Sequence, residues 1–241
     1  DGSIDNVPSL ISLFSKNYPD LQISYLWQQD RGFRAGQARN MGIRQARGEI
    51  IILLDGDMLP AENFINRHVD FHQKHKRSVL STGRKIIDDK YIFPRFSKNY
   101  SSNPELLWEF LKNKASNNMI ENNFRTKWYR SERPWMAFFS CSASFPNDQK
   151  ARYNEHLVGW GIEDWDIAIE FYSNNYDVIY QSTPCAYHVD YKPVISNAFR
   201  NNNHSQLVDF ARNTLLFIDT HENVDLTECA IALRNYALQE N

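Results

Sequence analysis

Two aspartates that follow a short apolar run are the first residues of this chain that could do chemistry. Asp55 and Asp57 flank Gly56 directly after five consecutive apolar residues, Ile50 to Leu54. A run of this length suits a strand buried on both faces of a parallel sheet, and open α/β sheets bind ligands at the carboxyl ends of their strands. Carboxylate oxygens suit Mg²⁺ or Mn²⁺, so a divalent cation carrying a pyrophosphate would fit there. An Asp-Gly hairpin turn without a ligand explains the tripeptide equally well.

A second acidic cluster opens a predicted helix in the last third of the chain. Glu163, Asp164 and Asp166 follow the tripeptide Gly159-Trp160-Gly161. Carboxylates are favoured near helix N-termini by the macrodipole, so helix capping accounts for the acidic residues. Capping does not account for the tryptophan between two glycines. Neighbours on a helix point about 100° apart, so Glu163 and Asp164 address different atoms.

Length, composition and charge indicate one globular domain without a generally basic surface. The 241 residues can bury one sizeable core, which suits one α/β domain with extensions. The hydrophobic fraction of 42% and the charged fraction of 23% are ordinary for a globular protein. The net charge of −2 argues against nucleic acid as a partner, although it does not exclude a local basic site for phosphates.

Cysteine spacing and apolar run lengths give expectations about the compartment. Cys141, Cys185 and Cys229 form no CxxC pair and no disulfide framework, so we expect a reducing, cytoplasmic location, with association at the inner face of the membrane left open. No run of about eighteen apolar residues is present that could form a transmembrane helix. The chain begins at Asp1-Gly2-Ser3 without an initiator Met or signal peptide, so we expect further residues, and other domains, upstream.

Helical and strand patterns alternate along the chain, as a parallel sheet requires. The predicted helices are Val7 to Phe14, Arg34 to Arg47, Phe64 to about Lys76, Glu163 to about Asn174, Leu207 to Phe217 and Leu226 to Leu238. The predicted strands are Leu21 to Trp27, Ile50 to Leu54, Val79 to Ile87, Tyr91 to Phe93, Trp135 to Phe145, Asp177 to Gln181 and Ala186 to Val189. The segment from Pro94 to Arg133 is rich in Asn, Ser and Lys, and we interpret it as an insertion with one helix, Pro104 to Lys114, that covers one side of a cleft.

Four motifs, in this order, resemble glycosyltransferases of the GT-A fold, family 2. They are Asp1-Gly2-Ser3, Ala38-Arg39-Asn40-x-Gly42, Leu54-Asp55-Gly56-Asp57 and Gly159-Trp160-Gly161-x-Glu163-Asp164. The last is similar to the element of β-1,4-galactosyltransferases, chondroitin polymerases and polypeptide GalNAc-transferases. No single motif is specific, but together they cover nearly the whole chain.

The resemblance implies a single GT-A domain over residues 1–241, with a mostly parallel central sheet flanked by helices and with its first strand missing ahead of Asp1. Its parts are a nucleotide-sugar-binding half (1–93), the insertion (94–133), an acceptor and catalytic half (134–204) and C-terminal helices (205–241).

The resemblance also implies roles in donor binding. Asp1 matches the residue that contacts the uracil base of a UDP-sugar, and Arg34 a residue that contacts the nucleotide. Asp55 matches the contact to ribose or sugar, and Asp57 the ligand of a Mn²⁺ or Mg²⁺ ion that bridges the two phosphates. His188 matches a further metal ligand, although a lone histidine in a strand is more often a core residue.

Three residues carry the implied acceptor chemistry. Asp164 matches the general base, and Glu163 and Trp160 lie beside the acceptor. Such a base removes the acceptor proton as its oxygen attacks the anomeric carbon, while a divalent ion offsets the charge on the leaving diphosphate. The implied activity is inverting, metal-dependent transfer of a sugar from a UDP-sugar to a hydroxyl of a glycan, peptide or lipid-linked acceptor.

Two other functions compete with this reading. A sugar-phosphate nucleotidyltransferase can share the sheet and an acidic metal site, but it needs a Gly-rich phosphate loop, for which the stretch from Gly32 to Gly36 is a poor candidate. A catalytically inactive carbohydrate-binding protein would not need both Asp57 and Asp164. The sequence alone does not exclude it.

Overall fold

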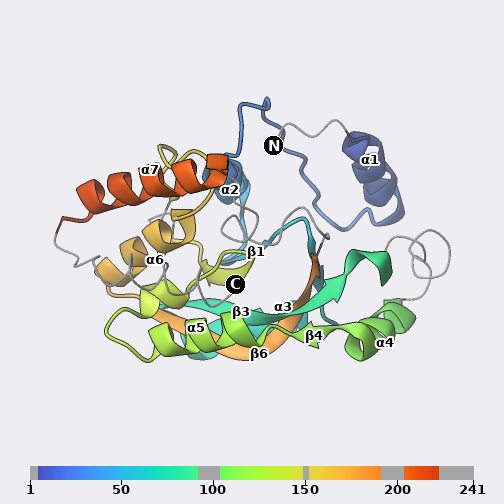
Figure 1. The fold of residues 1–241 in the computed structure, drawn as a ribbon. Coiled ribbons are helices and arrows are strands. Elements are labelled where there is room, and N and C mark those ends of the chain that lie inside the picture. The colour runs from blue at the N-terminus through green and yellow to red at the C-terminus, as the bar shows by residue number, and fades with distance from the viewer. Residues whose placement is uncertain (1–4, 92–103, 149–151, 191–203, 223–241) are drawn as a thin grey trace.

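The computed structural model describes residues 5–91, 104–148, 152–190 and 204–222 (Figure 1). Its helices are α1 (Val7–Asn17), α2 (Ala35–Gln45), α3 (Phe64–Lys74), α4 (Pro104–Lys114), α5 (Met119–Tyr129), α6 (Glu163–Ser173) and α7 (His204–Thr220), with 3-10 turns η1 (Asp89–Tyr91) and η2 (Pro134–Ala137). Its strands are β1 (Ile50–Leu54), β2 (Met58–Pro60), β3 (Ser78–Asp88), β4 (Ser116–Asn117), β5 (Ser142–Pro146) and β6 (Asp177–Asp190).

The strands form one mixed sheet in the order β1-β5-β3-β6-β2, with β4 paired to β3. Only the β3–β6 pair is parallel among the described pairs, and the others are antiparallel. The predicted α/β class with a helix-flanked central sheet is confirmed, but the expectation of a mostly parallel sheet is wrong for the described strands. The prediction that Ile50 to Leu54 is buried on both faces is also wrong, because β1 is at the end of the strand order and only Ile51 among its residues is buried. An apolar run does not indicate the direction of the neighbouring strands, which is why the sequence did not indicate the antiparallel pairs.

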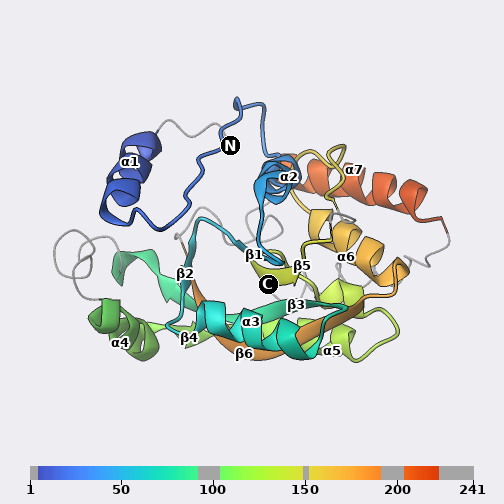
Figure 2. The same cartoon turned by 180° about the vertical axis from the view of Figure 1, so that it is seen from behind.

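Helices cover the sheet on both faces. In Figure 1 α5 lies in front of β3 and β6, and in the opposite view of Figure 2 α3 lies in front of them. The main core lies where α6, η2 and β5 meet, and its largest fully buried side chains include Trp135, Phe138, Phe145, Phe171 and Phe217. Burying an aromatic side chain of this size contributes about 2–3 kcal/mol, so this cluster anchors the base of α6.

Several predicted elements differ in the structure. The segment from Leu21 to Trp27 is not a strand: no described strand pairs with it, and both of these end residues are more than half exposed. The predicted strand from Trp135 begins as η2, whose Pro134 favours a helical first turn, and becomes a strand only at Ser142. The two final predicted strands are one strand, β6.

Helix α1 and the insertion differ from what the sequence predicted, and one further predicted helix cannot be compared with the structure. The helical spacing of the apolar residues in α1 predicts a side that faces a core, but none of its residues is buried. The insertion contains α5 in addition to the predicted α4, and α5 packs on β6 and η2. The predicted helix from Leu226 to Leu238 lies outside the described residues.

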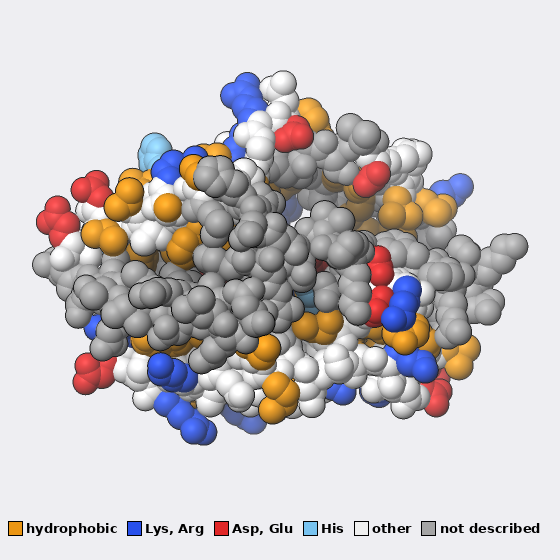
Figure 3. Space-filling model, viewed as in Figure 1, with side chains coloured by type: hydrophobic (Ala, Val, Ile, Leu, Met, Phe, Trp, Pro, Cys, Tyr) orange, Lys and Arg blue, Asp and Glu red, His pale blue; other side chains and the backbone are white. Residues whose placement is uncertain are grey.

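Charged side chains are interspersed on the face drawn in Figure 3. Among its described residues, Lys and Arg lie close to Asp and Glu around the rim. No described helix is long and apolar enough to cross a membrane.

Candidate active site

Asp57 and His188 lie side by side because β2 pairs with β6 in antiparallel register. Met58 pairs with His188, and Val189 donates its N–H to the Asp57 carbonyl oxygen over 2.9 Å. This register places His188 Nε2 3.2 Å from Asp57 Oδ2. The hydrogen bond from His188 lowers the pKa of the Asp57 carboxyl, although partial burial opposes the shift. A half-exposed carboxylate and an imidazole therefore face the same space.

The pair of Asp57 and His188 fits an open metal site to which the substrate brings further ligands. No three His, Cys, Asp or Glu side chains within the described ranges are arranged to hold a metal ion. A carboxylate and an imidazole are nonetheless donors that a divalent transition ion accepts, and such sites are commonly completed by substrate phosphates and water. Asp55, the other carboxylate of the turn, is engaged elsewhere.

Arg39 of α2 joins this turn to the acidic start of α6. Its Nη2 donates to both carboxylate oxygens of Asp55, at 2.9 and 3.2 Å. Its Nη1 lies 3.8 Å from Glu163 Oε1 and 3.8 Å from Asp164 Oδ1. The two acidic motifs, far apart in the sequence, therefore meet around one guanidinium group. Three carboxylates and one cation leave an excess of negative charge there.

Burial raises the pKa of both carboxyl groups at the start of α6. For Glu163 burial is the largest cause and the charge of Asp164 adds to it, while Arg39 opposes the rise. For Asp164 burial again dominates, and Arg39 and hydrogen bonds with Ser140 oppose it. Glu163 Oε2 and Asp164 Oδ1 are buried and accept no hydrogen bond from the described residues. A carboxylate oxygen in this state is suited to take a proton from a substrate hydroxyl.

The Tyr153 ring lies beneath the Arg39 guanidinium group. The Arg39 guanidinium lies 5.4 Å from the centre of the Tyr153 ring, and the Tyr153 hydroxyl forms a hydrogen bond with Ser140. Asn40, the neighbour of Arg39 on α2, donates to the Tyr153 carbonyl oxygen over 2.8 Å and accepts its N–H over 2.9 Å. Asn40 therefore fixes the backbone of Tyr153, whose ring lies against Arg39. This explains why Arg39 and Asn40 occur together in one motif.

The loop before α6 is held in a conformation that favours glycine. Gly159 and Gly161 have φ angles of 83° and 95°, and Ile162, which caps α6, has a φ of 79°. A β-branched residue in the left-handed region is strained by about 1–3 kcal/mol, and such strain gathers at functional sites. A Cβ atom on Gly159 would lie 2.2 Å from Asp209 Cγ, so a larger residue there would have to displace the Asp209 carboxylate and adopt a strained φ angle.

Helix α7 supports this loop from outside. Asp209 Oδ2 accepts the N–H of Trp160 at 3.4 Å, and Asn213 Nδ2 donates to the Gly161 carbonyl oxygen over 3.0 Å. The Trp160 ring packs 5.9 Å, centre to centre, from that of Phe210. The sequence predicted α7 as a helix but gave no signal for these contacts, because they depend on tertiary packing.

Asp166 points away from the site, as expected from its place on the helix. Its Oδ1 lies 3.0 Å from His221 Nε2, and its side chain is almost fully buried. We expect Asp166→Ala to lower the free energy of unfolding by about 1–3 kcal/mol, since a buried hydrogen bond is lost. Denaturant unfolding measures this. A folded variant of wild-type stability that has lost donor binding would contradict the assignment.

Asp1 and Arg34 are the other two residues that were predicted to contact the nucleotide of the sugar donor. Asp1 lies outside the described residues. Arg34 precedes α2, where its guanidinium donates to Gln37 Oε1 over 2.8 Å and to the Gln29 carbonyl oxygen. The structure thus shows Arg34 organising its own loop, and its contact with a nucleotide stays a prediction.

Comparison with known proteins assigns the chain to a family. Residues 1–142 match the sequence model of Glycosyl transferase family 2, and the chain belongs to that family. It is 28% identical over 181 residues to the hyaluronan synthase of Pasteurella multocida, covering 68% of this chain and 18% of the relative. It is 30% identical over 192 residues to the chondroitin synthase of Pasteurella multocida (strain Pm70), covering 72% of this chain and 19% of the relative. The chain thus spans about a fifth of these relatives.

Solved structures share the fold at low sequence identity. The structure of S. aureus TarS 1-349 in complex with UDP-GlcNAc matches 95% of this chain, and 58% of its own, with a TM-score of 0.53 and 18% identity. The structure of GalNAc-T7 with UDP, GalNAc and Mn²⁺ matches 97% of this chain, and 46% of its own, with a TM-score of 0.54 and 14% identity. These similarities establish the GT-A type of fold for this member of Glycosyl transferase family 2.

Proposed function

We propose that this domain transfers a sugar from a UDP-sugar to an acceptor hydroxyl, with inversion at the anomeric carbon and with a divalent ion. The observation that carries the proposal is the position of Arg39 between Asp55 and the pair Glu163 and Asp164. It places a strand-end turn suited to a diphosphate next to a buried carboxylate suited to proton transfer. Family membership supports a nucleotide-sugar donor, and the UDP named with both related structures favours UDP.

The donor side of the proposal rests on Asp57 and His188. These two side chains would hold Mn²⁺ or Mg²⁺, which offsets the charge that develops on the leaving diphosphate. Asp55, fixed by Arg39, is then left to accept a hydroxyl of the ribose or the sugar. Asp1 and Arg34 complete the nucleotide contacts in this proposal.

The acceptor side rests on the start of α6. Asp164 accepts the proton of the attacking hydroxyl through its buried Oδ1, which accepts no hydrogen bond from the described residues, and Glu163 orients the acceptor through a second hydroxyl. Trp160, held by α7, offers a ring face against which a sugar can lie. The acceptor class is a carbohydrate chain or another hydroxyl-bearing substrate.

Arg39 should control the pH dependence of turnover. A base is active when deprotonated, so the raised pKa values of Glu163 and Asp164 place the acidic limb of the kcat profile above the ordinary carboxyl range. The positive charge of Arg39 opposes this rise in pKa and so keeps the limb at a lower pH. We expect Arg39→Met to move the limb up by about one pH unit or more. UDP-sugar hydrolysis at a series of pH values measures it. Arg44→Met, an exposed arginine on the same helix, is the control, and an unmoved limb in Arg39→Met would contradict the role.

Calorimetric titration with UDP, with and without Mn²⁺, tests the proposed function. We expect UDP to bind more tightly than GDP or ADP, and Mn²⁺ to raise its affinity. The same titration on His188→Ala should lose the Mn²⁺ effect. No binding of any nucleotide would reject the proposal. Binding of UDP without turnover of any UDP-sugar would instead indicate the inactive carbohydrate-binding alternative.

A further inference from the structure

Two buried histidines of α3 share one serine hydroxyl of the sheet. His68 Nδ1 lies 2.7 Å, and His72 Nε2 lies 2.8 Å, from Ser144 Oγ of β5. The two histidines are four residues apart, so they lie on one face of the helix that covers the sheet in Figure 2. His68 and Ser144 are fully buried, and His72 is 5% exposed. These contacts fix α3 on the sheet, and neither histidine belongs to the candidate active site.

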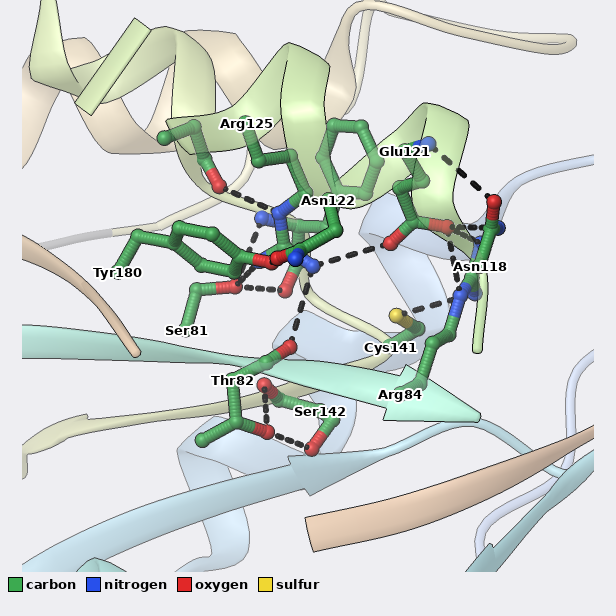
Figure 4. Close-up of polar contacts among 12 residues, drawn as sticks. Ser81, Thr82, Arg84, Asn118, Glu121, Asn122, Arg125, Cys141, Ser142 and Tyr180 are labelled. Atoms are coloured by element: carbon green, nitrogen blue, oxygen red, sulfur yellow. Dashed lines mark hydrogen bonds and ion pairs between the residues drawn. The ribbon is translucent and has the colours of Figure 1, made fainter. Parts of the chain in front are cut away.

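A row of polar groups continues from His68 across the same face of the sheet. Cys185 Sγ of β6 lies 3.8 Å from His68 Nε2 and donates to Thr82 Oγ1 of β3 over 3.0 Å. Thr82 Oγ1 and Ser142 Oγ of β5 share a hydrogen bond of 2.6 Å, which Figure 4 shows on the side of β3 away from Arg125. Hydroxyl and thiol groups make up this row, so it offers no negative charge to a protonated histidine.

The single hydrogen of the Ser144 hydroxyl serves this arrangement while both rings are neutral. A serine oxygen can donate to one ring nitrogen and accept from the other, which requires one protonated and one unprotonated nitrogen. A proton added to the accepting nitrogen removes the acceptor of the Ser144 hydroxyl. It also places a positive charge in a buried site, which costs more than the lost hydrogen bond. The hydrogen bonds and the burial therefore both favour a neutral pair.

Among the described residues, no group around the pair balances a charge on either ring. Burial is the largest cause that lowers the pKa of His68 to about 4, and His72 and Arg67 lower it further. Burial also lowers the pKa of His72 to about 4, and His75 adds to this shift, while hydrogen bonds to two backbone carbonyl oxygens oppose it. In the sheet, β1 and β5 have no titratable side chain, and β3 presents a threonine. Burial raises the pKa of the Cys185 thiol of β6, which therefore stays neutral.

We infer that His68 and His72 form an acid-sensitive contact, which holds α3 on the sheet while both rings are neutral and releases it when either ring takes a proton. Histidines of the unfolded or released chain take up protons near pH 6.5, whereas the folded pair resists protonation. The contribution of the pair to stability is therefore complete above about pH 6.5 and is lost as the pH falls from there toward 4. Mild acid is the signal to which this contact responds.

The release of α3 would reach the candidate ion site through one core cluster. The rings of His68 and Phe64 pack with their centres 4.7 Å apart, and Phe64 shares a buried cluster with Met58. Met58 directly follows Asp57 and pairs with His188. Loss of α3 from the sheet therefore loosens the strands that carry both proposed ligands. In this respect alone the inference rests on the proposed function.

The pH dependence of stability tests the inference. In the double variant His68→Asn/His72→Gln, side-chain amides replace Nδ1 and Nε2, so both can still bond Ser144 but neither takes a proton. Between pH 7 and pH 5 we expect the unfolding equilibrium constant of the wild type, from urea denaturation, to rise about 10²-fold more than that of the double variant. His156→Gln removes an exposed histidine elsewhere and should keep the wild-type pH dependence. An equal pH dependence in the wild type and the double variant would overturn the inference.

NMR of the wild type provides a second test, which holds even where the double variant does not fold. We expect the ring signals of His68 and His72 to remain those of neutral imidazole at pH 5.5. Between pH 7 and pH 5, amide exchange corrected for its intrinsic pH dependence should accelerate at least tenfold more in α3 than in α6. A ring that titrates near pH 6.5 in the folded chain, or equal acceleration in both helices, would contradict the inference. UDP binding at pH 7, where the pair is neutral, reports on the proposed function independently.

Discussion

Asp164→Asn is expected to lower kcat for sugar transfer by about 10²–10⁴ while leaving UDP affinity nearly unchanged. The amide keeps the shape of the carboxylate but cannot take a proton. Asp164 Oδ1 is buried, accepts no hydrogen bond from the described residues, and lies 3.8 Å from Arg39 Nη1. A carboxylate in these surroundings is suited to accept a proton from the attacking hydroxyl.

Glu163→Gln is the matched variant, because it changes the neighbouring carboxylate in the same cluster. If Glu163 orients the acceptor, its loss should raise the acceptor KM more than it lowers kcat. Transfer close to wild type in Asp164→Asn, together with its abolition in Glu163→Gln, would reverse the two roles. If both variants keep wild-type turnover, the start of α6 is not the catalytic cluster.

Asp57→Ala is expected to reduce metal-supported turnover by at least about 10²-fold, the scale for losing a preorganised electrostatic contact. Asp57 is half exposed, is held at 3.2 Å from His188, and has a lowered pKa, so it is anionic across the working pH range. Its removal leaves His188 as the single protein ligand of this pair. Titration with Mn²⁺, followed by UDP binding and by turnover, measures the loss.

Asp70→Ala controls for the removal of one carboxylate, since Asp70 is exposed on α3 and takes no part in the proposed site. His188→Ala should show the same direction of change as Asp57→Ala, because both remove one ligand. An Mn²⁺ dependence that is unchanged in Asp57→Ala would show that the ion, if bound, lies elsewhere.

The elements with the strongest local patterns could be predicted from the sequence. The apolar run of β1, the amphipathic α3 and the acidic start of α6 appear close to their expected bounds, since each pattern is local in the sequence. Strand direction and the β6 bulge depend on partners distant in the sequence, and no local pattern records them. The segment from Leu21 to Trp27 was predicted to be a strand from its local pattern, but it forms none.

The candidate site likewise contains one contact that the sequence led us to expect and one that it did not. The adjacency of Asp57 and His188 was expected from the resemblance, and the β2–β6 register produces it. The link through Arg39 was not expected, although Arg39 lies within one of the motifs that carried the resemblance. A motif identifies which residues matter, whereas the carboxylates that an arginine joins are set by tertiary structure.

The most direct measurement of the central claim is the anomeric configuration of the sugar released or transferred by the full chain. UDP-sugars are incubated with the protein and Mn²⁺, and the first product is followed by proton NMR before it mutarotates. The proposed site predicts a product of the opposite configuration to the donor, formed only with the divalent ion and lost in Asp164→Asn. A product that retains the donor configuration, or one formed equally well without the metal ion, would contradict it.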